Sequence, residues 1–238
     1  MYLGGYGTGL YLMWDPTYVL ILIGVALSLI ASAGVRRTFS RYSTVRSASG
    51  ITGEETARRI LSYAGITDVK IQHVSGQLND HYNPKTKVVN LSDAVYGNNS
   101  VSAVAVAAHE CGHVIQHAKG YAPLSIRTAL VPAANFGSGA SWFIILAGIL
   151  FSIPPLITMG IVLFSLAVLF QLVTLPVEFN ASRRALGILQ ETGILGNEEG
   201  RSARKVLRAA ALTYVAAAAA SILQLLRLII LFGRNRNN

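Results

Sequence analysis

Residues 129–175 read ALVPAANFGSGASWFIILAGILFSIPPLITMGIVLFSLAVLFQLVTL, and they contain no Asp, Glu, Lys or Arg. The run is more than twice as long as the roughly 20 apolar residues that cross a bilayer once. Pro154 and Pro155 interrupt it near its middle, and adjacent prolines are typical of turns between helices. We therefore predict a transmembrane helical hairpin over residues 129–175, with the two prolines at its turn.

Positive charges beside the apolar runs indicate the orientation of the chain. The apolar run 18–35 is long enough for one anchor helix, and four arginines follow it: Arg36, Arg37, Arg41 and Arg46. The segment 176–205, after the hairpin, carries a second basic group: Arg183, Arg184, Arg201, Arg204 and Lys205. Because cytoplasmic flanks of membrane helices are rich in Lys and Arg, both segments are predicted to be cytoplasmic.

The last apolar run, 209–226, lies between Arg208 and Arg227 and leaves two interpretations open. It could span the membrane with both arginines reaching the interfaces, or pack as a buried helix. A span would leave Arg234 and Arg236 outside the cell, against the positive-inside rule. We therefore expect three to four transmembrane helices.

The composition is that of a membrane protein. Hydrophobic residues make up 52% of the chain and charged residues 13%, which is unusual for a soluble domain. The net charge of +9 comes without the aromatic-interleaved basic patch of nucleic-acid-binding proteins, so we expect no nucleic acid partner. Cys111 is the single cysteine, which excludes an internal disulfide. No Lys or Arg precedes Tyr18, whereas a signal peptide has a positive start, so we expect the first run to be a retained anchor.

Five segments are predicted along the chain. They are an N-terminal segment and anchor (1–35), a cytoplasmic α/β domain (36–128), the hairpin (129–175), a second cytoplasmic segment (176–205), and a C-terminal apolar helix with a basic tail (206–238). Within the α/β domain the predicted elements are a helix opened by a Thr52–Glu55 capping box, strands at 68–74 and 87–91, and a helix from Asn99 or Ser100 to about Lys119.

That last helix contains His109-Glu110-Cys111-Gly112-His113, a complete H-E-x-x-H motif. Residues i and i+4 share one helical face, so both imidazoles can reach one tetrahedral ion. Glu110 is then placed to act as the general base on a water molecule. The motif predicts one Zn²⁺ per chain, and the alternative is a helix whose two histidines are satisfied by other polar groups.

A catalytic zinc needs a third protein ligand. His117 continues the same helical face but is too far along the axis from His109 for easy joint ligation. Glu178 follows the end of the hairpin, on the same predicted side of the membrane as His109, and is our preferred third ligand. The other candidates lie in a polar stretch that we expect to be solvated: Glu191, Glu198 and Glu199.

Two stretches resemble the bacterial membrane zinc metallopeptidases of the YugP type, a gluzincin-like group: 107–117 (AAHECGHVIQH) and 176–186 (PVEFNASRRAL). The resemblance covers nearly the whole chain and implies a zincin-like cytoplasmic domain, a bacterial cell membrane location and peptidase activity. The chain is also similar to the wider integral-membrane gluzincins, which typically carry Asp four residues after the ligand Glu. Ser182 stands there instead, so Ser182 or Asn180 is expected to orient a zinc-bound histidine.

The sequence leaves the oxyanion donor open among four residues: His117, Tyr121, Tyr82 and Arg183. Zincins commonly bind a peptide along an exposed sheet edge, and the predicted edge strand is Lys87, Val88, Val89, Asn90 and Leu91.

These observations predict a mostly α-helical, multi-pass zinc metalloendopeptidase that cleaves polypeptides at the cytoplasmic membrane surface. Its expected partners are the lipid bilayer, a polypeptide substrate, and membrane proteins or further copies of the chain. The alternative is an inactive metal-binding membrane scaffold. Transport is disfavoured because the hairpin lacks the ionisable groups that transporters place inside their spans.

Overall fold

The computed structural model describes residues 15–233. The predictions for residues 1–14, and for Arg234 and Arg236, lie outside these residues. The chain divides into two compact units. Among the described residues, a helical unit comprises residues 15–30, Leu130–Gln171 and residues 216–233; a mixed unit comprises Ala31–Ala129 and Leu172–Val215.

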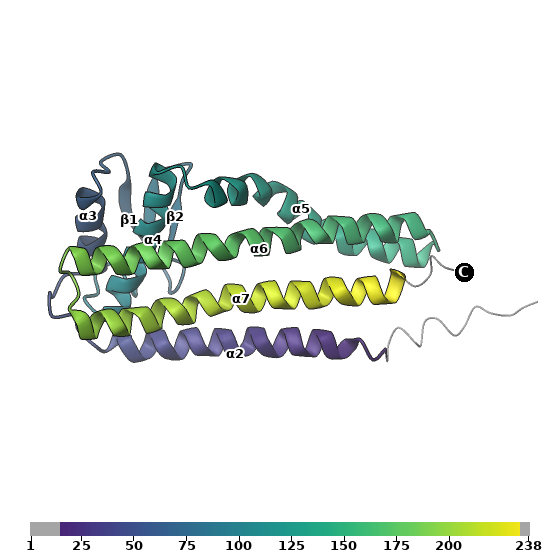
Figure 1. Cartoon of the computed structure of the whole chain (residues 1–238), viewed down its shortest axis with the longest axis horizontal. Helices are drawn as coiled ribbons and strands as arrows, with labels where there is room; N and C mark the ends of the chain where they lie inside the picture. The colour runs from purple at the N-terminus through teal and green to yellow at the C-terminus, as the bar shows by residue number, and fades with distance from the viewer. Residues whose placement is uncertain (1–14, 234–238) are drawn as a thin grey trace, which may run out of the picture. The chain divides into compact units, whose positions relative to one another are not determined.

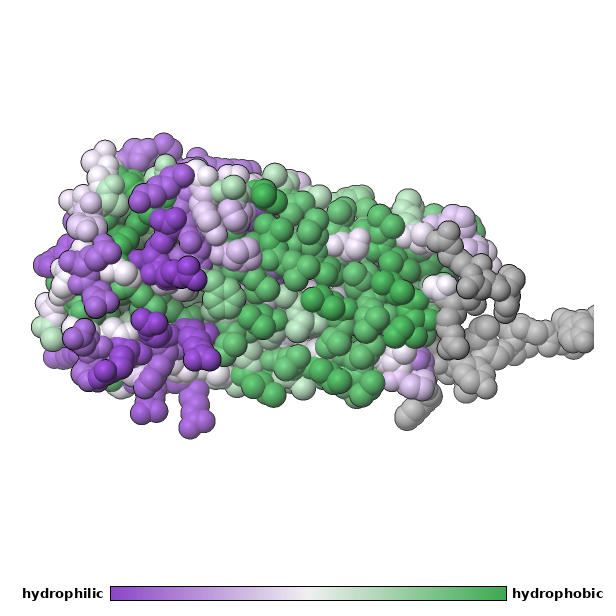
Figure 2. All heavy atoms as spheres, viewed as in Figure 1, coloured by the Kyte–Doolittle hydropathy of each residue, from purple (hydrophilic) through white to green (hydrophobic). Residues whose placement is uncertain are grey.

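Four long helices are long and apolar enough to cross a membrane (Figure 1): α2 (Tyr18–Ser43), α5 (Ala122–Leu150), α6 (Pro154–Glu191) and α7 (Asn197–Gly233). The fourth is the element that the sequence left undecided. In the helical unit large apolar side chains face outward, Phe143 with 77% of its surface exposed, and Figure 2 shows apolar residues gathered over these helices. Such a surface is typical of membrane-interaction sites.

The hairpin forms as α5 and α6, and its turn is at residues 151–153. Pro154 and Pro155 occupy the first turn of α6, where the missing proline N–H groups leave no helical hydrogen bond unmade. Gly137 lets the two helices approach closely, because a Cβ there would lie 2.5 Å from the Leu163 carbonyl oxygen. Small residues serve the same purpose in other membrane helix pairs.

Arg227 of α7 is buried within the helical unit rather than free at an interface. Its guanidinium lies 3.9 Å from an Asp15 carboxylate oxygen and 4.3 Å from the centre of the Tyr18 ring. An ion pair and a cation–π contact reduce the cost of a charge in apolar surroundings.

The sheet of the mixed unit has three strands in the order β1-β3-β2. Strand β1 (Lys70–Val74) runs parallel to β3 (Val88–Ser92), with Lys70 opposite Val88; β2 (His81–Asn83) is antiparallel, with Tyr82 opposite Val89. The prediction that residues 87–91 form an exposed edge was wrong, because β3 pairs on both sides. The edge beyond β3 is β2, which was missed because three residues are too few to show alternation.

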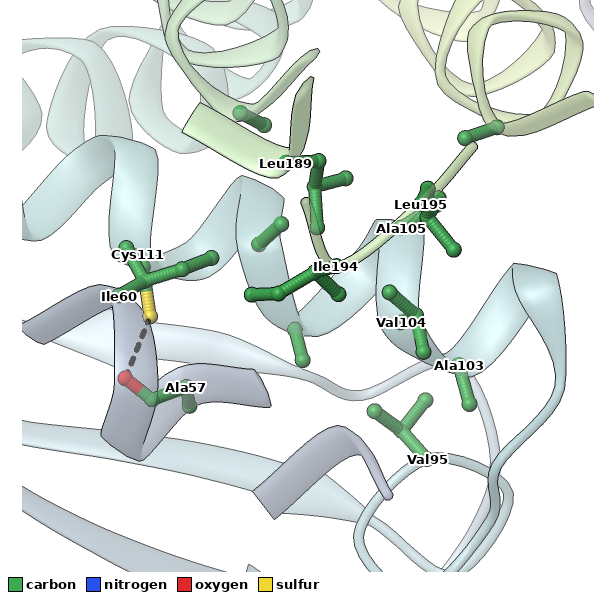
Figure 3. Close-up of a cluster of buried hydrophobic side chains, with 14 of the residues drawn as sticks. Ala57, Ile60, Val95, Ala103, Val104, Ala105, Cys111, Leu189, Ile194 and Leu195 are labelled. Atoms are coloured by element: carbon green, nitrogen blue, oxygen red, sulfur yellow. Dashed lines mark hydrogen bonds between the residues drawn. The ribbon is translucent and has the colours of Figure 1, made fainter. Parts of the chain in front are cut away.

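Helix α4 (Val101–Ala118) lies at the centre of the mixed unit, and α3 (Gly53–Tyr63) packs on it. Ser100 caps α4, and the Thr52–Glu55 capping box opens α3 as predicted. Figure 3 shows the core formed by side chains of α3, α4, the end of α6 and the loop after it. Cys111 points into this core, its thiol 3.7 Å from the Ala57 carbonyl oxygen, and so away from the histidine face of α4.

Candidate metal centre

His109, His113 and Glu178 meet inside the mixed unit, although Glu178 is far from the histidines in sequence. One ligand atom from each lies within 4.8 Å of the others. One Glu178 carboxylate oxygen is 3.2 Å from His109 Nε2 and 3.6 Å from His113 Nε2. Helix α4 supplies the two imidazoles and α6 supplies the carboxylate, so the contact between these two helices creates the cluster.

The two separations between the Glu178 carboxylate oxygen and the histidine nitrogens are compatible with a tetrahedral zinc ion. Ligand atoms about 2.0–2.1 Å from such an ion lie roughly 3.3–3.4 Å from one another, which is close to these two nitrogen–oxygen distances of 3.2 and 3.6 Å. A direct charge-assisted hydrogen bond would be nearer 2.7–2.9 Å. Two imidazole nitrogens and one carboxylate oxygen are also the donor set of several catalytic zinc sites, so the residues present fit the metal.

Hydrogen bonds to Gln116 orient His113. The Gln116 amide nitrogen donates to the Val177 carbonyl oxygen at 2.8 Å and to Asn180 Oδ1 at 3.0 Å, which leaves its oxygen to face His113 Nδ1 at 3.0 Å. His113 Nδ1 must therefore carry the proton, and Nε2 is free to bind a metal. Gln116 was not predicted, although its place three residues after His113 on a buried helix was a usable signal.

Ser182 contacts the imidazole of His109. Its hydroxyl oxygen is 3.2 Å from His109 Nδ1, so it can accept the Nδ1 proton and leave Nε2 directed at Glu178. A hydroxyl is a weaker acceptor than the aspartate typical of the wider gluzincins, because it carries no charge. Asn180 acts one step further away, through Gln116.

Glu110 lies beside the cluster and is almost fully buried, with 7% of its surface exposed. One of its carboxylate oxygens accepts the Tyr82 backbone N–H at 2.9 Å. This bond fixes the carboxylate against the edge strand β2. Glu110, the three-residue cluster and the sheet edge are thus contiguous.

The two buried carboxylates affect His113. Burial alone lowers the pKa of its imidazole, but contacts with Glu178, the charge of Glu110 and the Gln116 bond outweigh burial, and the pKa is raised above its usual value. Metal binding needs the neutral imidazole. We infer that a metal entering the site displaces a proton from this cluster.

Tyr214 contacts the cluster and was not predicted from the sequence. The Tyr214 hydroxyl on α7 interacts with the Glu178 carboxylate, and Tyr214 also experiences the charges of Glu110 and Arg127. Arg127 on α5 has a buried Nε with no hydrogen-bond partner among the described residues. Tyr214 interrupts an alanine-rich apolar run, and a polar-tipped ring there was a usable signal.

The remaining candidates make contacts outside the three-residue cluster. His117 Nδ1 is 2.9 Å from the Tyr82 hydroxyl, and Tyr121 lies 5.9 Å from the Arg184 guanidinium. Arg183 lines a groove beside Ser182. The acidic alternatives are also engaged elsewhere: Glu191 with Tyr63, Glu198 with Arg201, and Glu199 with the Ala48 N–H.

Gly112 holds α4 and α6 at the distance that the cluster needs. A Cβ at this position would lie 2.6 Å from the Ala181 carbonyl oxygen. We expect Gly112→Ala to force the helices apart, to destabilise the protein by about 1–3 kcal/mol, and to weaken metal binding. Denaturant unfolding and zinc titration would measure both effects.

Gly187→Ala on α6 is the matched control, because the nearest atom to its added Cβ would be 3.9 Å away. In a helix this change is expected to be neutral or stabilising by up to about 1 kcal/mol. Equal stability and equal zinc affinity of the two variants would contradict the packing role of Gly112.

The chain is similar in sequence to a known protein family and to a known bacterial protein. The model of a family described as "Putative neutral zinc metallopeptidase" matches residues 17–233. The "Putative membrane protease YugP" of Bacillus subtilis (strain 168) is 48% identical over 220 residues, which are 92% of this chain and 98% of that protein. No solved structure matches the chain. The similarity extends over the helical and mixed units alike.

Proposed function

The chain belongs to the family described as "Putative neutral zinc metallopeptidase", and we propose that it is a membrane-bound endopeptidase with zinc held by His109, His113 and Glu178. The observation that carries the proposal is the convergence of these three ligand atoms within 4.8 Å. The outer hydrogen bonds of both imidazoles support it, since they direct each Nε2 to the same point.

The reaction that this arrangement supports is hydrolysis of a peptide bond. A bound zinc ion would polarise the scissile carbonyl and make a water molecule acidic enough to attack near neutral pH. Glu110 accepts the proton from that water and delivers it to the leaving amine. Its burial beside the cluster supports this role, because water exclusion strengthens electrostatic interactions at the reacting atoms.

Tyr214 is our candidate for the donor to the oxyanion that develops on the scissile carbonyl, and Arg127 adds a positive charge beside it. Removing one such donor typically lowers kcat by about 10²–10³-fold. We expect Tyr214→Phe to show this loss in peptide hydrolysis with zinc affinity near that of the wild type. A fall in zinc affinity with unchanged kcat would instead mean that Tyr214 only supports Glu178.

The substrate backbone is proposed to lie along β2. This strand forms one edge of the sheet, and its Tyr82 N–H points at Glu110. An extended chain added there would bring its carbonyl groups past the base.

The site is proposed to face the cytoplasm of a bacterial cell. The arginines of residues 36–46 and of 176–205 support this orientation. The relative from Bacillus subtilis is named a membrane protease, and the four candidate spans agree with a membrane location. Substrates would then be polypeptide segments at the inner membrane surface.

Metal removal tests the proposed activity. The detergent-purified protein is incubated with fluorescein-labelled casein before and after treatment with a chelator, and again after zinc is restored. We expect cleavage to disappear with the chelator and to return with about one equivalent of zinc per chain, because three ligands form a single site. Cleavage that persists without metal would contradict the proposal.

A further inference from the structure

A basic groove runs along the mixed unit beside the metal cluster. Its volume is about 570 Å³, and α6 and α7 form its walls. Three of its lining residues are arginines, and the others that matter here are apolar: Arg183, Arg204, Arg208, Phe179, Leu186 and Leu207. No Asp or Glu lines it. The groove therefore combines a cationic rim with an apolar wall.

The three arginines are without acidic partners. Among residues 15–233, the arginines that form ion pairs are Arg58, Arg201 and Arg227, and none of these lines the groove. Like charges gathered on one groove repel each other, at a cost that a bound anion would remove. Guanidinium groups are well suited to phosphate, because their planar forks can donate two parallel hydrogen bonds.

From this geometry we propose that the groove binds the headgroup of an anionic phospholipid, with the apolar wall contacting the adjoining acyl chain. The walls are formed by the charged ends of α6 and α7, next to the apolar stretches that make both helices candidate membrane spans. In a membrane, lipid headgroups would therefore lie close to the groove. Phe179 lines this groove and has 45% of its surface exposed; an acyl chain could cover its ring, and a free phosphate could not. Basic pockets between membrane helices on the cytoplasmic side bind lipid headgroups in other proteins.

The proposal is independent of the peptidase activity, since it depends on charge and shape outside the three metal ligands. Binding in the groove can be distinguished from general attraction of arginines to a charged membrane, because the chain has a second arginine cluster that can serve as a control. This control cluster is Arg36, Arg37 and Arg41, which are exposed on α2 and are not among the residues that line the groove.

The test compares R183Q/R204Q/R208Q with R36Q/R37Q/R41Q, which loses the same charge. Calorimetric titration of the detergent-purified full chain uses three probes: short-chain phosphatidylglycerol, short-chain phosphatidylcholine and inorganic phosphate. We expect the wild type to prefer phosphatidylglycerol over both other probes. The groove variant should bind it roughly a hundredfold more weakly, and the α2 variant within about twofold of wild type.

Thermal unfolding establishes that each variant is folded. If the triple groove variant unfolds, the single variant R204Q replaces it. We expect R204Q to bind phosphatidylglycerol about fivefold more weakly than the wild type. Equal losses in both triple variants would overturn the proposal in favour of diffuse charge. Inorganic phosphate binding as tightly as the lipid, or poly-glutamate displacing the lipid from the groove, would overturn it in favour of a free-anion or an acidic-peptide site.

Discussion

Glu110→Gln is expected to abolish most peptide hydrolysis while zinc binding persists. Loss of a general base typically costs about 10²–10⁴-fold in rate, and the glutamine amide cannot accept a proton from water. The variant should fold normally, because its side-chain oxygen can still accept the Tyr82 N–H that Glu110 accepts at 2.9 Å. Casein cleavage rates and zinc content of the two proteins measure the two effects.

Glu191→Gln is the matched control for this substitution. Glu191 is exposed, and its carboxylate contacts Tyr63 at 3.2 Å, away from the cluster. We expect it to leave the rate unchanged. If Glu110→Gln were as active as this control, Glu110 would have no role in proton transfer, and the alternative of a metal-binding scaffold would be favoured.

Glu178→Gln is expected to have the largest effect on the metal itself. The amide oxygen is a poor zinc ligand compared with a carboxylate, and the change also removes the negative charge that faces both imidazoles. We expect zinc affinity to fall more than about 100-fold, beyond the 10–100-fold typical of outer partners such as Ser182. Competition titration with a zinc-binding dye measures the affinity.

His117→Ala provides the contrast within the same region. His117 Nδ1 contacts the Tyr82 hydroxyl at 2.9 Å and lies outside the group of three ligand atoms. Its removal should leave zinc affinity within about twofold. A variant series in which His117→Ala loses zinc and Glu178→Gln keeps it would show that the third ligand is a histidine.

Much of the fold could be predicted because its signals are local. The charge-free run 129–175, its proline pair and the capping residues before α3 and α4 each act on their own segment of chain. The paired histidines were predictable for the same reason, since a helix places i and i+4 on one face. Glu178 could be predicted as the third ligand because a hairpin crosses the membrane twice and so returns the chain to the side on which the histidines lie.

The features that were missed depend on contacts between segments distant in sequence. The order β1-β3-β2 places β3 in the middle of the sheet, and no alternation within residues 87–91 could reveal how many neighbours that strand has. Tyr214 reaches Glu178 only because α7 packs against the site. Without knowing whether residues 209–226 formed a membrane helix, the sequence could not identify this tyrosine as a partner.

X-ray absorption at the zinc edge of the purified wild-type protein tests the proposed ligand set. We expect one zinc per chain with two imidazoles and one carboxylate oxygen among its ligands, at distances of about 2.0–2.2 Å. A spectrum that shows three imidazole ligands or a sulfur ligand would contradict the proposed ligand set. So would a purified protein that binds no zinc.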